Sequence, residues 1–182
     1  MLGYVFWHYP LAGIAAADYE SSLRSFRSAL AEHPPAGFRG SLTFAIPRVP
    51  WLDADAAYED WYELDDFTSL GVLNEAAVST FRKMAHDDVA RMAGGGSGGV
   101  YRLISGPGAL RGARYATWIR KPAGTSYPRF YEGMADLLAA PHVSLWQRQL
   151  TLGPATEFCL HSEEELNLSP DYSPLKLTVR VL

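Results

Sequence analysis

The sequence predicts an α+β fold in which two consecutive β-α-β-β-α-β units form one α/β barrel. Three observations indicate this. Two segments open alike, at Trp7–Pro10 and Trp118–Pro122, and each leads from a strand through an Ala-rich helix to a second strand. The predicted elements follow the order of such a unit twice, although the second copy has a reduced last helix. Finally, 48% of the 182 residues are hydrophobic, which is enough for one sizeable core.

Alternating apolar and polar side chains predict the strands of the first unit. We expect these strands at residues 3–9, 38–46, 58–64 and 100–105. The glycine-rich run at 94–99 precedes the last of them and is interpreted as a flexible connector.

Apolar residues at helical spacing predict two helical stretches in the first unit. The first begins near Asp18, a suitable N-cap, and ends at His33 because two prolines follow. The second covers residues 66–92, with an expected break near Ser79 or His86.

The second unit repeats the pattern in shorter form. We expect strands at 113–121, 143–150 and 155–161 and a closing strand at 175–181, with a helix from 126 to 140. Ser126 and Pro128 fit the start of that helix, and Ser162 with Glu165 predicts a further short one. The units are expected at 1–107 and 112–182, packed together as one compact domain.

Composition excludes several classes of protein. The net charge is −4 without a basic stripe, so we expect no nucleic acid as a partner. No apolar run reaches the roughly 18 residues of a membrane span, so no membrane partner is expected. The beginning of the chain does not look like a signal peptide, which predicts a cytoplasmic location. A lone cysteine, Cys159, forms neither an internal disulfide nor a Cys-based zinc site, and its predicted role is a small buried side chain.

Two strand sequences carry a resemblance to a known group of proteins. They are Tyr-Val-Phe-Trp-His at 4–8 and Tyr-Glu-Asp-Trp-Tyr at 58–62, the latter followed by the helix from Asp66. With the order of elements over nearly the whole chain, they resemble the dimeric α/β-barrel superfamily of ferredoxin-like folds. That superfamily includes antibiotic-biosynthesis monooxygenases, EthD-like and NIPSNAP-like proteins, and haem-handling members. No single subfamily is indicated.

The resemblance implies two fused ferredoxin-like units whose sheets meet face to face. A ligand cavity would then lie between the sheet faces and under the second helix of each unit. Ligand pockets are generally apolar, with a few convergent polar groups. Strands that mix aromatic residues with His, Asp and Arg suit that description.

Five residues on the strands are candidates for the site. His8 could act as a general base, since imidazole titrates near neutral pH, or be a hydrogen-bonded histidine at a strand end. Tyr62 is the second catalytic candidate, as a hydrogen-bond donor, and Trp61 could stack on a planar substrate. Asp60 and Arg39 are candidates for substrate binding. Alternatively the large aromatic residues fill a barrel core, and strand parity decides which members point inward.

Two helical residues complete the candidates. Asn74 is expected to contact substrate from the helical stretch above the third strand. His86 is a candidate haem ligand, by analogy with haem-degrading relatives, but Asp87 and Asp88 after it also fit a helix start or a solvated surface. No constellation of His and carboxylate residues supports a metal site.

These observations predict a small protein that acts on an aromatic or polyketide-like molecule. The favoured function is a cofactor-independent oxygenase or a related enzyme, in which His8 abstracts a proton. The alternatives are a non-catalytic barrel that binds a small aromatic or apolar ligand, and a haem-binding protein. A monomer and a homodimer are both open. We expect the site in the first half, because the stretch from Tyr58 to Met92 is complete only there.

Overall fold

Nine antiparallel strands form a single sheet in the computed structural model, which describes residues 1–108 and 111–182 and, of Ala56, the backbone only. The order across the sheet is β8-β5-β7-β6-β4-β1-β3-β2-β9. The strands of the first half are β1 (Leu2–Pro10), β2 (Phe38–Pro47), β3 (Ala56–Leu64) and β4 (Ala93–Ser105). Those of the second half are β5 (Tyr115–Ile119), β6 (Ser144–Arg148), β7 (Phe158–Ser162), β8 (Leu175–Thr178) and β9 (Arg180–Val181).

The end of the chain nearly closes this sheet into a barrel. β8 pairs with β5 at one edge, and β9, which follows directly, pairs with β2 at the other edge. The amide of Val179 donates to the carbonyl of Arg114, and the amide of Leu182 donates to that of Thr43. One extended segment therefore reaches both edges, although it covers β2 only from Thr43 to Ala45.

The predicted arrangement of two fused ferredoxin-like units is wrong. The strands do not form two sheets that meet face to face, because β4 of the first half pairs directly with β6 of the second. The predicted order of elements placed most strands correctly along the chain. It could not fix which distant strands pair, since that depends on contacts between segments far apart in sequence.

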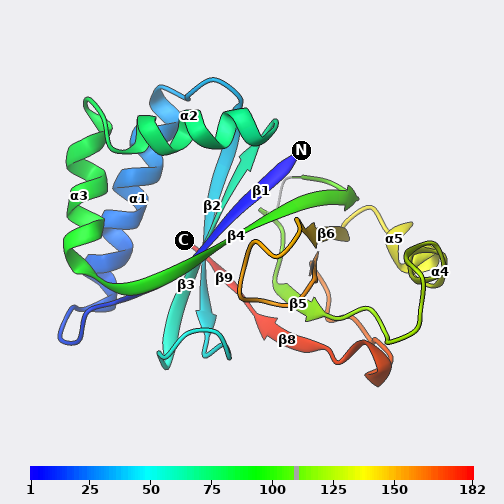
Figure 1. Ribbon diagram of the computed structural model, residues 1–182. Coiled ribbons are helices and arrows are strands. Elements are labelled where there is room, and N and C mark those ends of the chain that lie inside the picture. Colours follow the sequence, from blue (N-terminus) through cyan, green and yellow to red (C-terminus); the bar gives the residue numbers. More distant parts are fainter. Residues whose placement is uncertain (109–110) are drawn as a thin grey trace.

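The helices lie outside the barrel in two groups (Figure 1). Beside the first half lie α1 (Ala16–Glu32), α2 (Phe67–Ala77) and α3 (Arg82–Met92). Beside the second lie α4 (Tyr127–Gly133) and α5 (Ala135–Leu138). The break between α2 and α3 falls near Ser79, as predicted, and Thr80 there has a positive φ of 54°. The short helix predicted after Ser162 is absent from the described structure, where a 3₁₀ turn at Pro170–Tyr172 precedes β8.

The glycine-rich run at 94–99 is a strand, so its prediction as a flexible connector was wrong. It forms the first part of β4 and pairs with β1, with Gly96 opposite His8. A Cβ at Gly96 would lie 2.7 Å from Cζ of Phe6, and one at Gly98 would lie 3.0 Å from Cε2 of Tyr4. Glycine is thus needed here because aromatic rings of the neighbouring strand cover the backbone.

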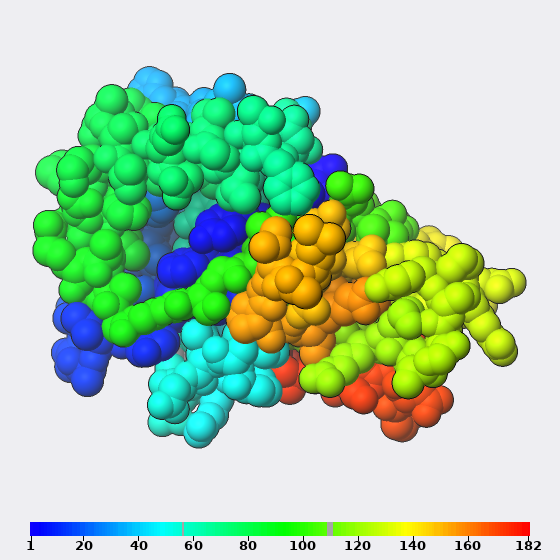
Figure 2. Space-filling view, viewed as in Figure 1, coloured from blue at the N-terminus to red at the C-terminus, as the bar shows by residue number. Residues whose placement is uncertain are grey.

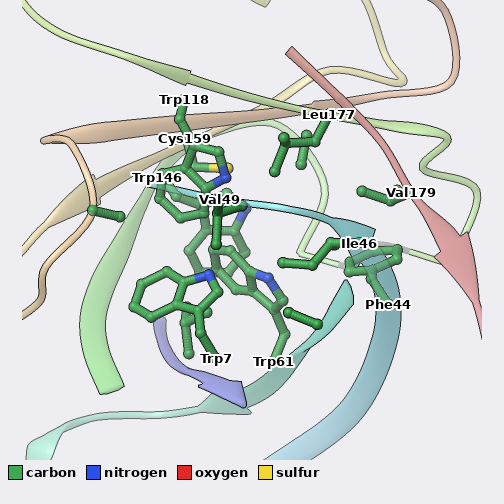
Figure 3. Close-up of a cluster of buried hydrophobic side chains, with 14 of the residues drawn as sticks. Trp7, Phe44, Ile46, Val49, Trp61, Trp118, Trp146, Cys159, Leu177 and Val179 are labelled. Atoms are coloured by element: carbon green, nitrogen blue, oxygen red, sulfur yellow. The ribbon is translucent and has the colours of Figure 1, made fainter. Parts of the chain in front are cut away.

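Four of the five tryptophans, Trp7, Trp61, Trp118 and Trp146, are buried inside the barrel (Figure 3). The ring centroids of Trp7 and Trp118 are 5.5 Å apart, and those of Trp61 and Trp146 are 5.0 Å apart. Trp51 completes the group, 5.4 Å from Trp118. These rings fill the interior, so the barrel is a packed core. Among the described residues, no helix has the length and apolar character needed to cross a membrane.

Candidate functional site

Neighbouring residues of β1 and β3 face two different environments. Successive side chains of a strand point to opposite faces of the sheet. Trp7 and Trp61 therefore point into the barrel, whereas His8, Asp60 and Tyr62 point out toward the helices.

A cavity of about 850 Å³ lies between this outer face and helices α1 to α3. Figure 2 shows it as a hollow, where atoms of the blue N-terminal strand are visible between the green helices and β4. Phe6, Phe26 and Leu73 are among its apolar walls, and Gly94 to Gly96 contribute backbone without side chains. The polar side chains that line the cavity are Tyr4, His8, Tyr19, Asp60, Tyr62, Asn74 and His86.

A hydrogen-bonded network forms the floor of this cavity. His8 Nε2 is 3.1 Å from Asp60 Oδ2, and His8 Nδ1 is 2.7 Å from the hydroxyl of Tyr19. Tyr62 donates its hydroxyl proton to Asp60 Oδ2 at 3.0 Å, and Thr43 donates to Oδ1. All five side chains are buried, and Phe6 stacks on the His8 ring at 5.4 Å. The network is thus satisfied within itself.

The surroundings of Asp60 favour its ionised form. Burial by itself raises the pKa of a carboxyl group. The charge of protonated His8 and the hydrogen bonds from His8, Thr43 and Tyr62 outweigh burial, so the pKa of Asp60 falls below its ordinary value of 3.8. An ionised carboxylate only accepts hydrogen bonds, so His8 Nε2 must carry a proton. When His8 is neutral, its Nδ1 therefore accepts a hydrogen bond from the Tyr19 hydroxyl.

The tyrosines beside Asp60 are held in their neutral form. Burial, and then the charge of Asp60, raise the pKa of Tyr62 well above its usual range. The same two causes, in the same order, raise the pKa of Tyr19. Both phenols therefore act as hydrogen-bond donors toward the His8–Asp60 pair.

The structure brings five of the seven predicted site residues to this cavity. His8, Asp60 and Tyr62 lie on its floor. Asn74 is exposed on α2 and lines the helical wall. His86 lines the same wall from α3, packs on the ring of Phe26, and has its Nδ1 3.2 Å from an Asp87 oxygen.

The other two predicted residues lie elsewhere. Trp61 points into the barrel interior, where it is fully buried among the other tryptophans. Arg39 is exposed and pairs with Asp65 at 2.5 Å. The cavity between sheet faces that the resemblance implied is replaced by packed side chains in the described structure. The cavity under the second helical stretch is present in the first half.

Two members of the network were missed by sequence reasoning. Tyr19 has the spacing of an apolar helical core residue, and Thr43 belongs to an ordinary alternating strand. Tyr19 reaches His8 across the turn between β1 and α1, and Thr43 reaches Asp60 from the neighbouring strand. No sequence pattern reports either contact.

In the second half of the molecule, packed apolar side chains lie between the sheet and its helices. Phe130 of α4 and Met134, which follows α4, pack there on Phe158 and Leu160, and all four are buried. The ring centroids of Phe130 and Phe158 are 4.4 Å apart.

Comparison with known proteins gives one informative result. No protein-family model matches the chain, and no curated protein does. Among solved structures, the chain is similar to a crystal structure described as an anthrone oxidase-like protein, with a TM-score of 0.57. The similarity covers 100% of this chain and 91% of that one at 7% sequence identity. At that identity the likeness establishes a shared barrel fold and no more.

Proposed function

We propose that this protein is an enzyme that removes a proton from an aromatic, apolar small molecule bound in the cavity beside His8. The observation that carries the proposal is the His8–Asp60 pair, which lies on the floor of an otherwise largely apolar cavity. Ionisable pairs in such surroundings are common at functional sites. The name of the structural neighbour supports an oxidase as the reaction class.

The network suggests the path of the proton. Tyr19 lines the cavity and its hydroxyl is 2.7 Å from His8 Nδ1, so we propose that this hydroxyl relays the proton of the substrate to Nδ1. The imidazolium formed in this step would be stabilised by Asp60 through Nε2. Because the pKa of Tyr19 is raised, its hydroxyl would receive one proton as it releases the other, without becoming a phenolate.

The oxidant in the proposed reaction is dioxygen. Loss of a proton from an anthrone-like methylene gives a carbanion that can transfer an electron to O₂ and then combine with it. The hydroperoxide so formed loses water to give a carbonyl group. One oxygen atom stays in the quinone, and the other leaves as water with the two methylene hydrogens.

Oxygen uptake with a panel of anthrone-like and quinol substrates tests the proposal. Product formation is followed in parallel by the absorption of the quinone. We expect His8→Gln to lower kcat/KM by about 100-fold or more, the usual contribution of a general base. Tyr19→Phe should lower it by about tenfold or more and keep the ring that packs beside His8. His33→Gln, an exposed histidine outside the cavity, is the matched control and should retain the wild-type rate.

Two outcomes would overturn the proposal. One is the absence of turnover over the whole panel, and the other is a folded His8→Gln variant that retains full activity. Binding without turnover, measured by quenching of tryptophan fluorescence, would favour the non-catalytic barrel. That alternative has support in the geometry, because both His8 nitrogens already have hydrogen-bond partners. A Soret band on haem titration, lost in His86→Ala, would favour haem binding.

A further inference from the structure

A second groove, of about 480 Å³, lies on a different face of α1 from the cavity. Its walls come from α1, from the beginning of β2, and from Leu182. Every charged side chain that lines it is an arginine: Arg24, Arg27, Arg39 and Arg111. In a chain with a net charge of −4, no Asp or Glu side chain lines this groove in the described structure.

Arg27 is the innermost of these arginines. It is partly buried, and its Nη1 donates to a main-chain carboxyl oxygen of Leu182 at 3.1 Å. Its Nε is buried and has no hydrogen-bond partner in the described structure. Burial is the main cause that lowers the pKa of Arg27, and the like charges of Arg111 and Arg24 add to it, although Asp60 acts in the opposite direction. An anion in the groove would compensate these charges.

The other three arginines use few of their N–H donors in contacts within the protein. Arg24 has a weak ion pair with Glu20 at 3.6 Å, and Arg39 uses its Nε for Asp65. Arg111 is exposed and has no hydrogen bond or ion pair with the described residues. A guanidinium group has five N–H donors, so most of these donors are available to a ligand.

The edge of β2 adds backbone donors to the same groove. β9 pairs with β2 only at Phe44 and Ala45, and Leu182 reaches Thr43. Ser41 lies two residues before Thr43, so its backbone faces the same edge, where no described strand continues the pairing. The side chains of Ser28 and Ser41 lie on the two walls.

We propose that this groove binds a small molecule through a phosphate group. Guanidinium groups form bidentate, charge-assisted hydrogen bonds with phosphate oxygens, and Glu20 and Asp65 occupy only part of the donors of Arg24 and Arg39. The site is separate from the cavity beside His8, so it does not depend on the function proposed for that cavity.

Calorimetric titration with inorganic phosphate, and then with a simple phosphate monoester, tests this site. The double variant Arg24→Gln/Arg111→Gln should weaken binding at least about tenfold, since it removes charged hydrogen-bond donors to the phosphate oxygens. These two residues are exposed, so the variant is expected to fold. Arg129→Gln, an exposed arginine on α4, is the matched control and should bind like the wild type.

Three results would overturn the proposal. The first is no heat of binding for phosphate at millimolar concentration and low ionic strength. The second is an equal loss of affinity in the Arg129→Gln control, which would indicate a general effect of net charge. The third is equal affinity for acetate and phosphate, which would indicate a site for any anion.

Discussion

Glu59 and Asp60 are neighbours in sequence, and both carboxyl groups are buried, yet they have opposite surroundings. Glu59 points into the barrel and accepts hydrogen bonds from the indoles of Trp7 and Trp61, each at 2.6 Å. His161 Nε2 approaches it at 3.9 Å. Asp60 points the other way, toward a cavity, and is bound by His8 and two hydroxyl groups.

This difference separates a carboxyl group held in the barrel core from one that lies beside the cavity. The partners of Glu59 are donors fixed in a packed aromatic core, so it serves to satisfy buried indole N–H groups. The partners of Asp60 include an imidazole and two phenol or alcohol groups, which can exchange protons. Strand parity alone assigns one carboxyl group to the core and the other to the cavity.

The largest loss of stability is expected for Glu59→Ala. The substitution leaves two buried indole N–H groups without an acceptor and opens a cavity in the barrel core. We expect a loss of about 3 to 5 kcal/mol in the free energy of unfolding. Urea denaturation measures this loss, and tryptophan fluorescence should report a changed environment for Trp7 and Trp61.

Glu75→Ala is the matched control, because Glu75 is exposed on α2 and lies outside the cavity. Its stability should stay within about 0.5 kcal/mol of the wild type. A Glu59→Ala protein as stable as this control would mean that the barrel core does not depend on Glu59.

A smaller loss of stability is expected for Asp60→Asn, about 1 to 3 kcal/mol at neutral pH, because the amide adds a donor where only acceptors fit. Since the folded pKa of Asp60 is below 3.8, its contribution is complete above that pH and is lost as pH falls through the folded pKa. Urea denaturation at about pH 7 and about pH 3 should therefore show a difference from wild type that shrinks in acid.

Asp53→Asn is the control for this pair of measurements, as an exposed aspartate far from the network in sequence. In Asp60→Asn the tryptophan fluorescence should remain like that of the wild type, in contrast to Glu59→Ala. A difference from wild type that grows in acid would show that Asp60 is not held ionised.

The smallest change in stability is expected for Glu63→Gln, and this change is an increase. Glu63 shares the strand face of Glu59, but its Oε1 is buried without a hydrogen-bond partner in the described structure. Burial raises the pKa of Glu63 to about 7, although Arg111 lowers it in part. The folded state then binds an extra proton between pH 4.5 and about 7, so stability falls as pH rises through this window.

The Glu63→Gln variant removes the free-energy cost of ionising this partly buried carboxyl group. It should be more stable than wild type at about pH 8, by about 1 kcal/mol because Glu63 is partly exposed, and should match it at about pH 4. Thermal unfolding over this range provides the measurement, with Glu75→Gln as the control. A gain that is equal at both pH values would rule out titration of Glu63 as its cause.

Many of the helices and strands could be predicted from the sequence. The alternation in β1, β2 and β3 and the helical spacing in α1 gave those elements within about two residues of their observed ends. The glycine run was misjudged because glycine disfavours strands in isolation. It is a strand here because the rings of Tyr4 and Phe6 cover it.

The candidate site could be predicted only in part. Aromatic and ionisable residues at 58–62 marked the strand, but the pattern could not tell which face would meet the helices. The pattern therefore predicts both Trp61 and Asp60 as cavity residues, and only Asp60 lines the cavity. Arg39 also fitted the pattern, yet it lies at the surface with Asp65.

The sequence by itself determined the local elements, because side-chain periodicity and helix caps act over a few residues. It also determined that a histidine and a carboxylate would lie on strands rich in aromatic residues. Only the tertiary structure decided that the strands form one nearly closed sheet, that the tryptophans fill it, and that Tyr19 and Thr43 complete the network. Those outcomes depend on pairing and packing between residues distant in the chain, and no local pattern encodes them.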